Sequence, residues 1–328
     1  PAAAQYNTAL PAALPGRPYP FPAVMPLILQ SLSPLSAADL DAVRKVANAS
    51  AFAPRSDTVA AAEDCDPLTP ALRDALDAVC GARGIDWAVV PAGRKLSDFR
   101  LVAMDMDSTL ITIECIDEIA DFCGLKAEVS AITEAAMRGE IDFTESLHQR
   151  VEALAGLPES VLAEVRDQVR LTPGAATLVR TVRRLGYTVG VVSGGFIEIV
   201  GPLAAQLQID HAHANALEVV DGVLTGRVSG PVVDRAEKAR KLREWAQQAD
   251  LPVERTVAVG DGANDLDMLA TAGMGIAFNA KPVVQARADT TVNVPYLDSV
   301  LFLLGISRDE VEEADATTCA GPYNPTHA

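Results

Sequence analysis

The sequence is poor in basic residues and lacks long hydrophobic runs. Its 328 residues include 27 lysines and arginines against 44 aspartates and glutamates, so the formal net charge is −17. This charge argues against nucleic acid and anionic membranes as main partners. No apolar run reaches membrane-spanning length, and no basic segment precedes an apolar one at the N-terminus. A small anionic substrate remains compatible with the charge, because a local cation and backbone dipoles can reverse the field inside a pocket.

Cysteine is scarce and shows no paired spacing. The five cysteines are an odd number, and none lies in a Cys-x-x-Cys pair. This spacing argues against a disulfide framework or a zinc knuckle and favours reduced thiols. Together with the lack of a membrane segment, it predicts a cytoplasmic protein.

The sequence does contain enough apolar material for a substantial core. It is 49% hydrophobic and 22% charged, and its length suits one large domain with a smaller one. Residues 1–22 hold six prolines and are predicted to form a flexible tail.

Residues 23–92 show the pattern of a small α+β module. Strand-like runs alternate with two amphipathic segments, of which the first begins at Ser36 and Asp39 in a capping pattern and the second at Thr69 and Pro70. The order resembles a degenerate version of the βαββαβ ligand-sensing (ACT-like) fold. We expect the module to serve in packing or in forming a homodimer.

From residue 97 to about 305, compact apolar runs alternate with helical stretches. Such runs are typical of strands buried on both faces of a parallel sheet, and they predict an α/β, Rossmann-like domain. The first three runs end at Asp105, Ser193 and Asp261. Because the ligand crevice of an open α/β sheet lies outside the carboxyl ends of its strands, we expect these residues to meet there.

Two segments interrupt this alternation. Residues 117–171 are almost wholly helical in pattern and follow the first strand, so they are predicted to form a cap over the crevice. The segment "ANALEVVDGVLTGRVSG" holds two strand-like runs around Asp221 and Gly222, a favourable hairpin turn. Residues 306–328 are expected to form a C-terminal tail.

Asp105 and Asp107 stand two positions apart at the end of the first strand. Two like charges at this spacing repel each other unless a positive charge lies between them, and a divalent cation such as Mg²⁺ prefers oxygen ligands. A calcium loop is an alternative, but "DMDST" lacks its glycine and distal glutamate. Asp261 offers a third carboxylate, whereas Asp265 could instead act as a charge at a helix N-terminus.

Two further segments can hold an anion. "VVSGGF" offers the Ser193 hydroxyl and the backbone N–H groups of Gly194 and Gly195, although Ser-Gly-Gly also makes ordinary turns. Lys238, seen alone, has the pattern of a solvated helix lysine. Neither segment defines a site by itself.

Taken together, these segments resemble a known family. "DMDST", "VVSGGF", Lys238 and "VGDGAND" occur in the order and spacing of the haloacid dehalogenase (HAD) superfamily. The longer match, over roughly residues 97–290, includes "ECIDEIA" and "AMRGEIDFTESLHQRV" and is similar to the phosphoserine phosphatase family within it. This resemblance implies Mg²⁺-dependent hydrolysis of the small molecule O-phosphoserine, the last step of L-serine biosynthesis, through an aspartyl-phosphate intermediate.

The resemblance also assigns roles to residues on the core. It implies that Asp105 is the nucleophile and that Asp107 is the general acid and base. Asp105, Asp261 and the backbone carbonyl of Asp107 are implied to hold Mg²⁺. Without Asp107 the pattern would fit a dehalogenase, so this residue favours phosphoryl transfer.

The remaining roles concern the substrate. The resemblance implies that Ser193, Gly194 and Lys238 clamp the phosphate, with Asn264 and Asp265 supporting the phosphate and metal ends.

On the cap side, the resemblance implies that Glu114 receives the ammonium group and Arg150 the carboxylate of the amino acid. Phe143 is implied to help close the site.

Two other functions remain open at this stage. The motifs are compatible with a phosphotransferase that passes the group from phosphoserine to another hydroxyl amino acid such as homoserine. An amino-acid sensor with a vestigial catalytic half is a candidate from a different class, but the intact set of acidic residues and Lys238 disfavours it.

Overall fold

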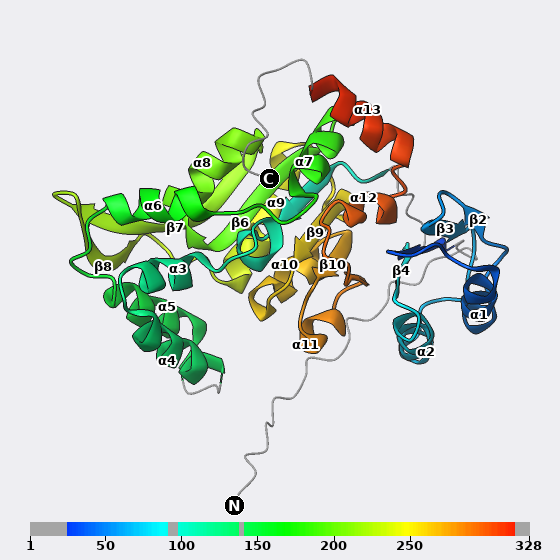
Figure 1. Ribbon diagram of the computed structural model, residues 1–328, viewed down its shortest axis with the longest axis horizontal. Coiled ribbons are helices and arrows are strands. Elements are labelled where there is room, and N and C mark those ends of the chain that lie inside the picture. The colour runs from blue at the N-terminus through cyan, green and yellow to red at the C-terminus, as the bar shows by residue number, and fades with distance from the viewer. Residues whose placement is uncertain (1–24, 91–97, 138–140, 319–328) are drawn as a thin grey trace, which may run out of the picture.

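The computed structural model describes residues 25–90, 98–137 and 141–318, which form two β-sheets with their covering helices (Figure 1). The predicted tail over residues 1–22 lies outside the described residues. Within the described ranges, no helix combines the length and the apolar character needed to cross a membrane. The expected α/β domain with a small N-terminal α+β region is confirmed.

The N-terminal module, residues 25–90, has the element order βαββαβ. Its antiparallel sheet runs in the order β2 (Ala53–Pro54), β3 (Val59–Ala62), β1 (Leu27–Ser31) and β4 (Ile85–Val89). Its helices are α1 (Ala37–Ala47) and α2 (Pro70–Gly81). The side chains of Ser36 and Thr69 cap these helices as the sequence predicts, because each oxygen accepts a backbone N–H of the first turn. The likeness to a ligand-sensing fold stays a prediction.

The large sheet contains Ser193 and the strands that lead to Asp105 and Asp261. Its strands, in spatial order, are β11 (Thr290–Val292), β10 (Met274–Phe278), β9 (Thr256–Gly260), β5 (Leu101–Met104), β6 (Thr188–Phe196), β7 (His211–Val220) and β8 (Val223–Ser229). The pairings from β11 to β7 are parallel, and β8 returns antiparallel to β7. The sequence order of the strands differs from their spatial order, so the central strands come from distant parts of the chain.

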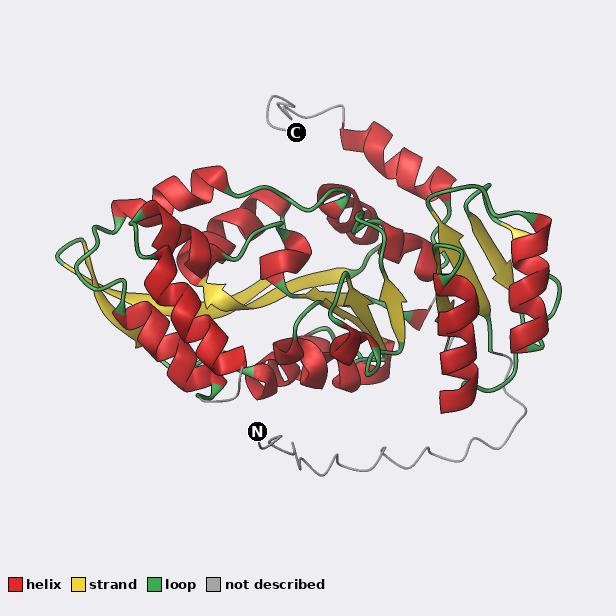
Figure 2. Cartoon of the chain, turned by 60° about the horizontal axis from the view of Figure 1, so that its bottom comes forward, coloured by secondary structure: helices red, strands yellow, loops and turns green. Residues whose placement is uncertain are grey.

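Helices cover both faces of this sheet (Figure 2). The helices that pack around it are α7 (Ala175–Arg184), α8 (Ile197–Leu207), α9 (Arg235–Gln248), α10 (Leu266–Thr271), α11 (Pro282–Gln285) and α12 (Ser299–Leu303). Alternate residues of β5 serve opposite faces: Val102 and Met104 belong to the apolar cluster with α7 and α8, whereas Leu101 and Ala103 belong to that with α9 and α10. Burial on both faces explains why the strands read as continuous apolar runs.

The cap is inserted between β5 and α7 and is helical, as predicted. Its helices are α3 (Cys115–Phe122), α4 (Lys126–Met137), α5 (Phe143–Glu152) and α6 (Ser160–Gln168). The chain enters and leaves it side by side, because Ile111 and Leu171 form an antiparallel bridge.

The C-terminal segment differs from the expected tail. It forms α13 (Arg308–Thr318), in which Val311 and Ala314 are buried. Arg184 on α7 donates to the carbonyl oxygen of Glu310 at 2.8 Å. The helix is mostly polar and buries only a narrow apolar face as it packs against α7, so its sequence does not indicate a packed helix.

The N-terminal module is docked against the edge of the large sheet. The backbone N–H and side-chain amide of Asn293, just after β11, donate to the Asp86 carboxylate of β4 at 2.9 and 3.0 Å. The buried Thr290 hydroxyl donates to the carbonyl oxygen of Trp87. Ile28 and Ala88 of the small sheet join the same apolar cluster as α12. The module therefore shares its core with the large domain.

Candidate active site

Three neighbouring strands bring the polar side chains of the crevice together. Strands β9, β5 and β6 lie side by side at the centre of the large sheet. Asp261 follows β9, Asp105 follows β5, and Ser193 lies near the end of β6. The predicted meeting of these three strand ends therefore occurs in the fold.

The loop after β5 turns sharply to present two carboxylates. The Asp105 side chain accepts the N–H of Met106 at 2.7 Å, and Ser108 takes the left-handed conformation with φ +55°. A Cβ at Gly195 would lie 2.8 Å from Asp107 Oδ2, so a side chain at this position would displace the carboxylate. Burial, followed by the charge of Glu114, raises the pKa of Asp107 to about 7.

Lys238 is fully buried, in contrast to the solvated position that its local pattern suggests. It extends from the first turn of α9, and its Nζ lies 2.8 Å from Asp105 Oδ1 and 2.7 Å from Asp265 Oδ1. Burial alone would lower the pKa of Lys238, but the two carboxylates raise it overall. The ammonium group is thus held charged inside the protein.

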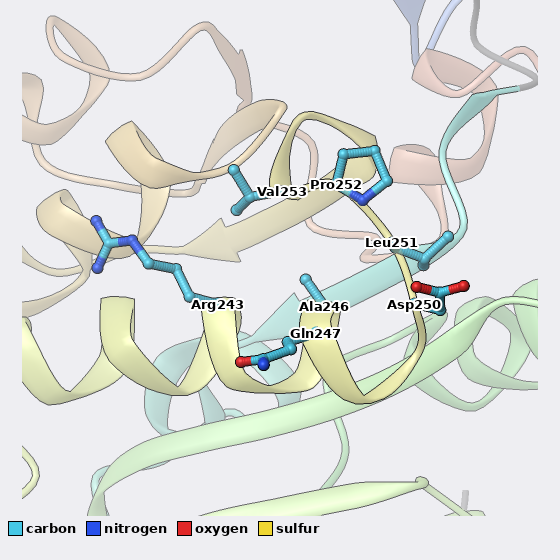
Figure 3. Close-up of a pocket in the computed structure, with 7 residues that line it drawn as sticks. All are labelled: Arg243, Ala246, Gln247, Asp250, Leu251, Pro252 and Val253. Carbon is cyan, nitrogen blue, oxygen red and sulfur yellow. The ribbon is translucent and has the colours of Figure 1, made fainter.

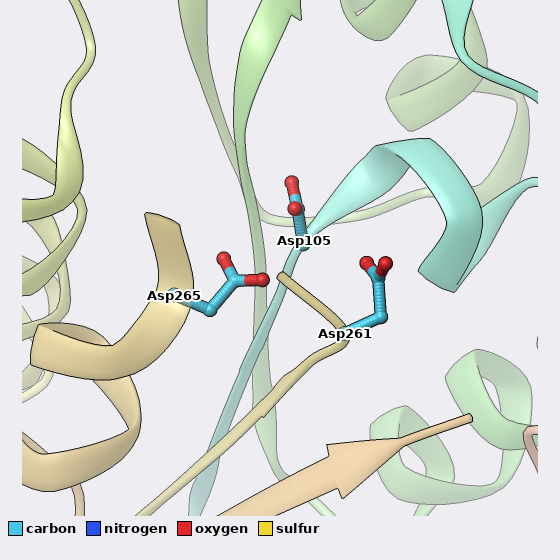
Figure 4. A group of neighbouring side chains, drawn as sticks. All are labelled: Asp105, Asp261 and Asp265. Atoms are coloured by element: carbon cyan, nitrogen blue, oxygen red, sulfur yellow. The ribbon is translucent and has the colours of Figure 1, made fainter. Parts of the chain in front are cut away.

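An acidic cluster surrounds this ammonium group. Carboxylate oxygens of Asp105, Asp261 and Asp265 come within 4.8 Å of one another, and Figure 4 shows the three side chains converging. Burial, and then the charge of Asp265, raise the pKa of both Asp105 and Asp261, the latter to about 6. Three carboxylates against one ammonium leave uncompensated negative charge, and an all-oxygen donor set suits a hard divalent cation.

The cluster differs in membership from the predicted metal set. Asp265, expected only to support the site, contributes a carboxylate to this group. The carboxylate of Asp107 is not among the three, and the contribution of its backbone carbonyl stays a prediction.

The Ser193 turn lies beside these carboxylates. The Ser193 hydroxyl is buried and accepts the N–H of Gly195 at 2.8 Å. Strand β6 continues through this turn to Phe196 with a shift in its register to β7, whereas the sequence suggested a loop. A Cβ at Gly194 would lie 3.3 Å from Phe143 Cζ and 4.0 Å from Asn264 Nδ2.

The structure thus places the cap residue Phe143 directly over the turn. Glu114 stands at the start of α3 and accepts a hydrogen bond from the Ser108 hydroxyl at 2.8 Å. Arg150 lies on α5, where burial lowers its pKa and the charges of Asp117 and Glu114 oppose that shift. Phe143 and Glu114 therefore lie beside the end of β6 and the loop after β5, respectively, and Arg150 lies near enough to Glu114 for the two charges to interact.

Two buried side chains in this region were not singled out from the sequence. Thr109 donates to Asp261 Oδ1 at 3.1 Å and so orients a carboxylate of the cluster. Asn215 on β7 donates to the Gly194 carbonyl oxygen at 2.7 Å and accepts the N–H of Val233 at 2.8 Å. Asn215 could have been found from the sequence, because it is a polar residue flanked by apolar residues in a strand segment.

An open groove of about 460 Å³ lies elsewhere, between α9 and residues 250–253 (Figure 3). It borders the segment that leads into β9, whereas the acidic cluster lies beyond the opposite end of that strand. We do not assign the chemistry to this groove, because the titratable cluster lies at the carboxyl ends of the strands, where ligands of α/β sheets bind.

The fold and the site define a class of protein. A parallel α/β sheet whose central strands end in an acidic cluster, under a helical cap inserted after the first of them, is the architecture of capped HAD proteins. The family described as haloacid dehalogenase-like hydrolase matches residues 102–270. Residues 27–76 match a family described as a domain of unknown function (DUF4072).

Relatives narrow this class. The phosphoserine phosphatase of Streptomyces coelicolor is 60% identical over 247 residues, which are 75% of this chain and 60% of that protein. A probable phosphoserine phosphatase from Vibrio cholerae, solved in unliganded form, is 37% identical with a TM-score of 0.71, over 88% of this chain and 89% of that one. A structure described as a phospho-aspartyl intermediate analogue of phosphoserine phosphatase is 40% identical with a TM-score of 0.59, over 64% and 99%.

The chain therefore belongs to the haloacid dehalogenase-like hydrolase family, in its phosphoserine phosphatase branch. It spans about 60% of the length of the Streptomyces relative. These relatives are described as phosphatases, which does not favour the phosphotransferase alternative.

Proposed function

We propose that this chain hydrolyses O-phosphoserine to serine and phosphate with Mg²⁺ as cofactor and an aspartyl phosphate at Asp105 as intermediate. The observation that carries the proposal is the position of Asp105. Its carboxylate is buried at the end of the central strand, 2.8 Å from the Lys238 ammonium group and beside the Ser193 turn. A nucleophile, a fixed cation and an anion-binding turn are the parts that phosphoryl transfer requires.

The cap supplies the argument for an amino-acid substrate. Glu114 offers a carboxylate for the ammonium group, and Arg150 offers a guanidinium for the carboxylate. Phe143 packs over the phosphate turn at Gly194. An Arg–carboxylate contact can be bidentate, which favours an amino acid over a sugar as the leaving group.

In the first step, an oxygen of Asp105 attacks the phosphorus atom and the bond from phosphorus to the serine oxygen breaks. Protonated Asp107 donates its proton to that leaving oxygen. Its pKa of about 7, raised by burial, keeps a useful fraction protonated near neutral pH. Lys238 and the Ser193 turn hold the phosphoryl oxygens throughout.

In the second step, water attacks the phosphorus atom of the aspartyl phosphate. Asp107, now ionised, accepts the proton of this water. The bond from phosphorus to Asp105 then breaks, releasing phosphate and restoring the carboxylate. Two in-line displacements at one centre replace one difficult displacement.

The acidic cluster fits a hard divalent cation, and Mg²⁺ is our proposal for it. Asp105, Asp261 and the backbone carbonyl of Asp107 would hold the ion, with Asp265 beside them. When bound, Mg²⁺ neutralises the phosphoryl charge that would otherwise repel Asp105.

The test is a phosphate-release assay with phosphoserine, phosphothreonine and a sugar phosphate, each with added Mg²⁺ and after exhaustive chelation. We expect phosphoserine to be preferred and chelation to abolish release. Full activity after chelation would contradict the metal assignment. Equal rates on all three substrates would contradict the amino-acid assignment, and transfer of labelled phosphate to homoserine would point to the phosphotransferase.

A further inference from the structure

The β7–β8 hairpin, which the proposed reaction does not use, is fastened to the cap. The N–H of Gly156 donates to the carbonyl oxygen of Leu224 at 2.9 Å, and the N–H of Leu224 donates to that of Leu157 at 2.8 Å. The N–H of Glu159 donates to the carbonyl oxygen of Gly222 at 2.8 Å. These bonds join the hairpin to the loop between α5 and α6 as a short piece of sheet.

The same hairpin is continuous with the catalytic sheet. Strand β7 pairs in parallel with β6, the strand that contains the Ser193 turn. In Figure 1 the hairpin extends past the other strands toward the cap helices. Besides the two chain crossings at Ile111 and Leu171, the hairpin therefore gives the cap a further attachment to the core.

Gly226 on β8 permits a close contact at this attachment. Its φ is +78°, and a Cβ there would lie 2.8 Å from Ala155 Cβ and 3.2 Å from both Cα and O of Glu152. Glu152 is the last residue of α5, the helix that carries Phe143 and Arg150. The absence of a side chain at Gly226 thus determines how closely α5 approaches the sheet.

We propose that Gly226 is a specificity-determining positioning residue, which sets the place of Arg150 and Phe143 over the phosphate site through its contact with the end of α5. This inference rests on the proposed function. A helix moves as a rigid unit, so a shift at Glu152 displaces both side chains. Asp105 belongs to the core and does not move with α5.

The experiment compares Gly226→Ala with Gly230→Ala. Gly230 has nearly the same backbone conformation, with φ +80°, but a Cβ there meets nothing within 4 Å. Both variants carry the same backbone strain, and only the first pushes on α5. The measurements are kcat and KM for phosphoserine and for an aryl phosphate, which has no amino-acid moiety for Arg150 to hold.

We expect Gly226→Ala to lower kcat/KM for phosphoserine by about tenfold to 10²-fold, as small misplacements of binding groups do, mainly through KM. The aryl phosphate should change by no more than about twofold, and Gly230→Ala should leave the ratio of the two substrates unchanged. Equal losses on both substrates, or equal effects of the two variants, would overturn the proposal.

A substitution on the cap side of the same contact tests the proposal even if Gly226→Ala does not fold. Ala155 is exposed in the loop after α5, so Ala155→Val enlarges the same contact from the cap. It should reproduce the selective loss. In the reverse direction, Ala155→Gly should partly restore specificity to Gly226→Ala, because it removes the nearest clash. Failure of both would overturn the proposal.

Hydrogen exchange separates this inference from the proposed function. Amides of α5 should exchange faster in Gly226→Ala than in Gly230→Ala, whichever substrate the enzyme takes. A wild-type chain that does not hydrolyse phosphoserine would contradict the proposed function, and the exchange result would still decide whether Gly226 positions α5. Unchanged exchange in α5 would refute the positioning role.

Discussion

The crevice and the junction with the N-terminal module both bury carboxylates, but they treat them differently. In the crevice, Lys238 contacts two of three clustered carboxylates, Asp105 and Asp265, so the cluster retains excess negative charge. At the junction, Asp86 is a single carboxylate that accepts two hydrogen bonds from Asn293. Burial raises the pKa of carboxyl groups in both places.

This difference separates a candidate ligand site from a contact that holds two parts of the chain together. The crevice is left electrostatically incomplete, as the proposed binding of a cation and a phosphate would require. At the junction, the Asp86 carboxylate finds its donors within the chain. Substitutions in the crevice should therefore change rates, and substitutions at the junction should change the free energy of unfolding.

The largest expected effect is that of Asp105→Asn. The change preserves shape and removes the attacking oxygen, so activity should fall by a factor typical of a lost nucleophile, on the order of 10⁶. No phosphate should become attached to this variant. Thermal unfolding serves as the control for folding, and labelled phosphate retained at a residue other than 105 would contradict the assignment.

Asp107→Asn should have a smaller effect of a different kind. Losing the proton shuttle should cost about 10²–10⁴-fold on phosphoserine, whose alkoxide is a poor leaving group. An aryl phosphate needs the acid less in the first step but still needs the base in the second. The variant should therefore accumulate hydroxylamine-sensitive phosphoprotein from an aryl phosphate. If it behaves like Asp105→Asn in this assay, the two carboxylates do not have separate roles.

Arg150→Ala should act on specificity rather than on chemistry. Loss of a charge-assisted hydrogen bond costs about 1.5–3 kcal/mol, or roughly tenfold or more in kcat/KM. The loss should appear with phosphoserine and not with an aryl phosphate. The same loss with both substrates would mean that Arg150 holds the cap together instead.

The smallest expected effect on turnover is at the junction. Asp86→Ala removes a buried carboxylate that accepts two hydrogen bonds from the exposed Asn293, which should cost about 1–3 kcal/mol of unfolding free energy without changing kcat. Asp41→Ala, at an exposed ion pair in the same module, is the control and should stay within about 0.5 kcal/mol. Calorimetry and phosphate release measure the two quantities. If Asp86→Ala lowered kcat without lowering the free energy of unfolding, the junction would not have a purely structural role.

The large sheet and its crevice were readable from the sequence for a physical reason. Strands buried on both faces leave long apolar runs, and the polar residues that end them are conspicuous. Asp105, Ser193 and Asp261 were therefore expected together, and the three strand ends are indeed neighbours. The separate catalytic and binding roles of these residues remain predictions.

Other features depended on contacts that local patterns do not encode. Lys238 has the sequence of a solvated helix residue, yet two distant carboxylates enclose it. Strand β2 has only two exposed residues, one of them Pro54, so no alternation could indicate it. Helix α13 buries only a narrow face, and its charged residues suggested a tail. In each case, a partner remote in sequence decided the outcome.

The bridge between Ile111 and Leu171 makes the cap a separable cassette. Its two ends meet at one point, so the core would need only a short turn to close the gap if the insertion were absent, and a longer insertion would add only a small cost in closure entropy. A cap of another length or composition could thus be inserted there while β5 and its neighbouring strands remain unchanged. Any inserted cap would also have to pack against the β7–β8 hairpin at Gly226.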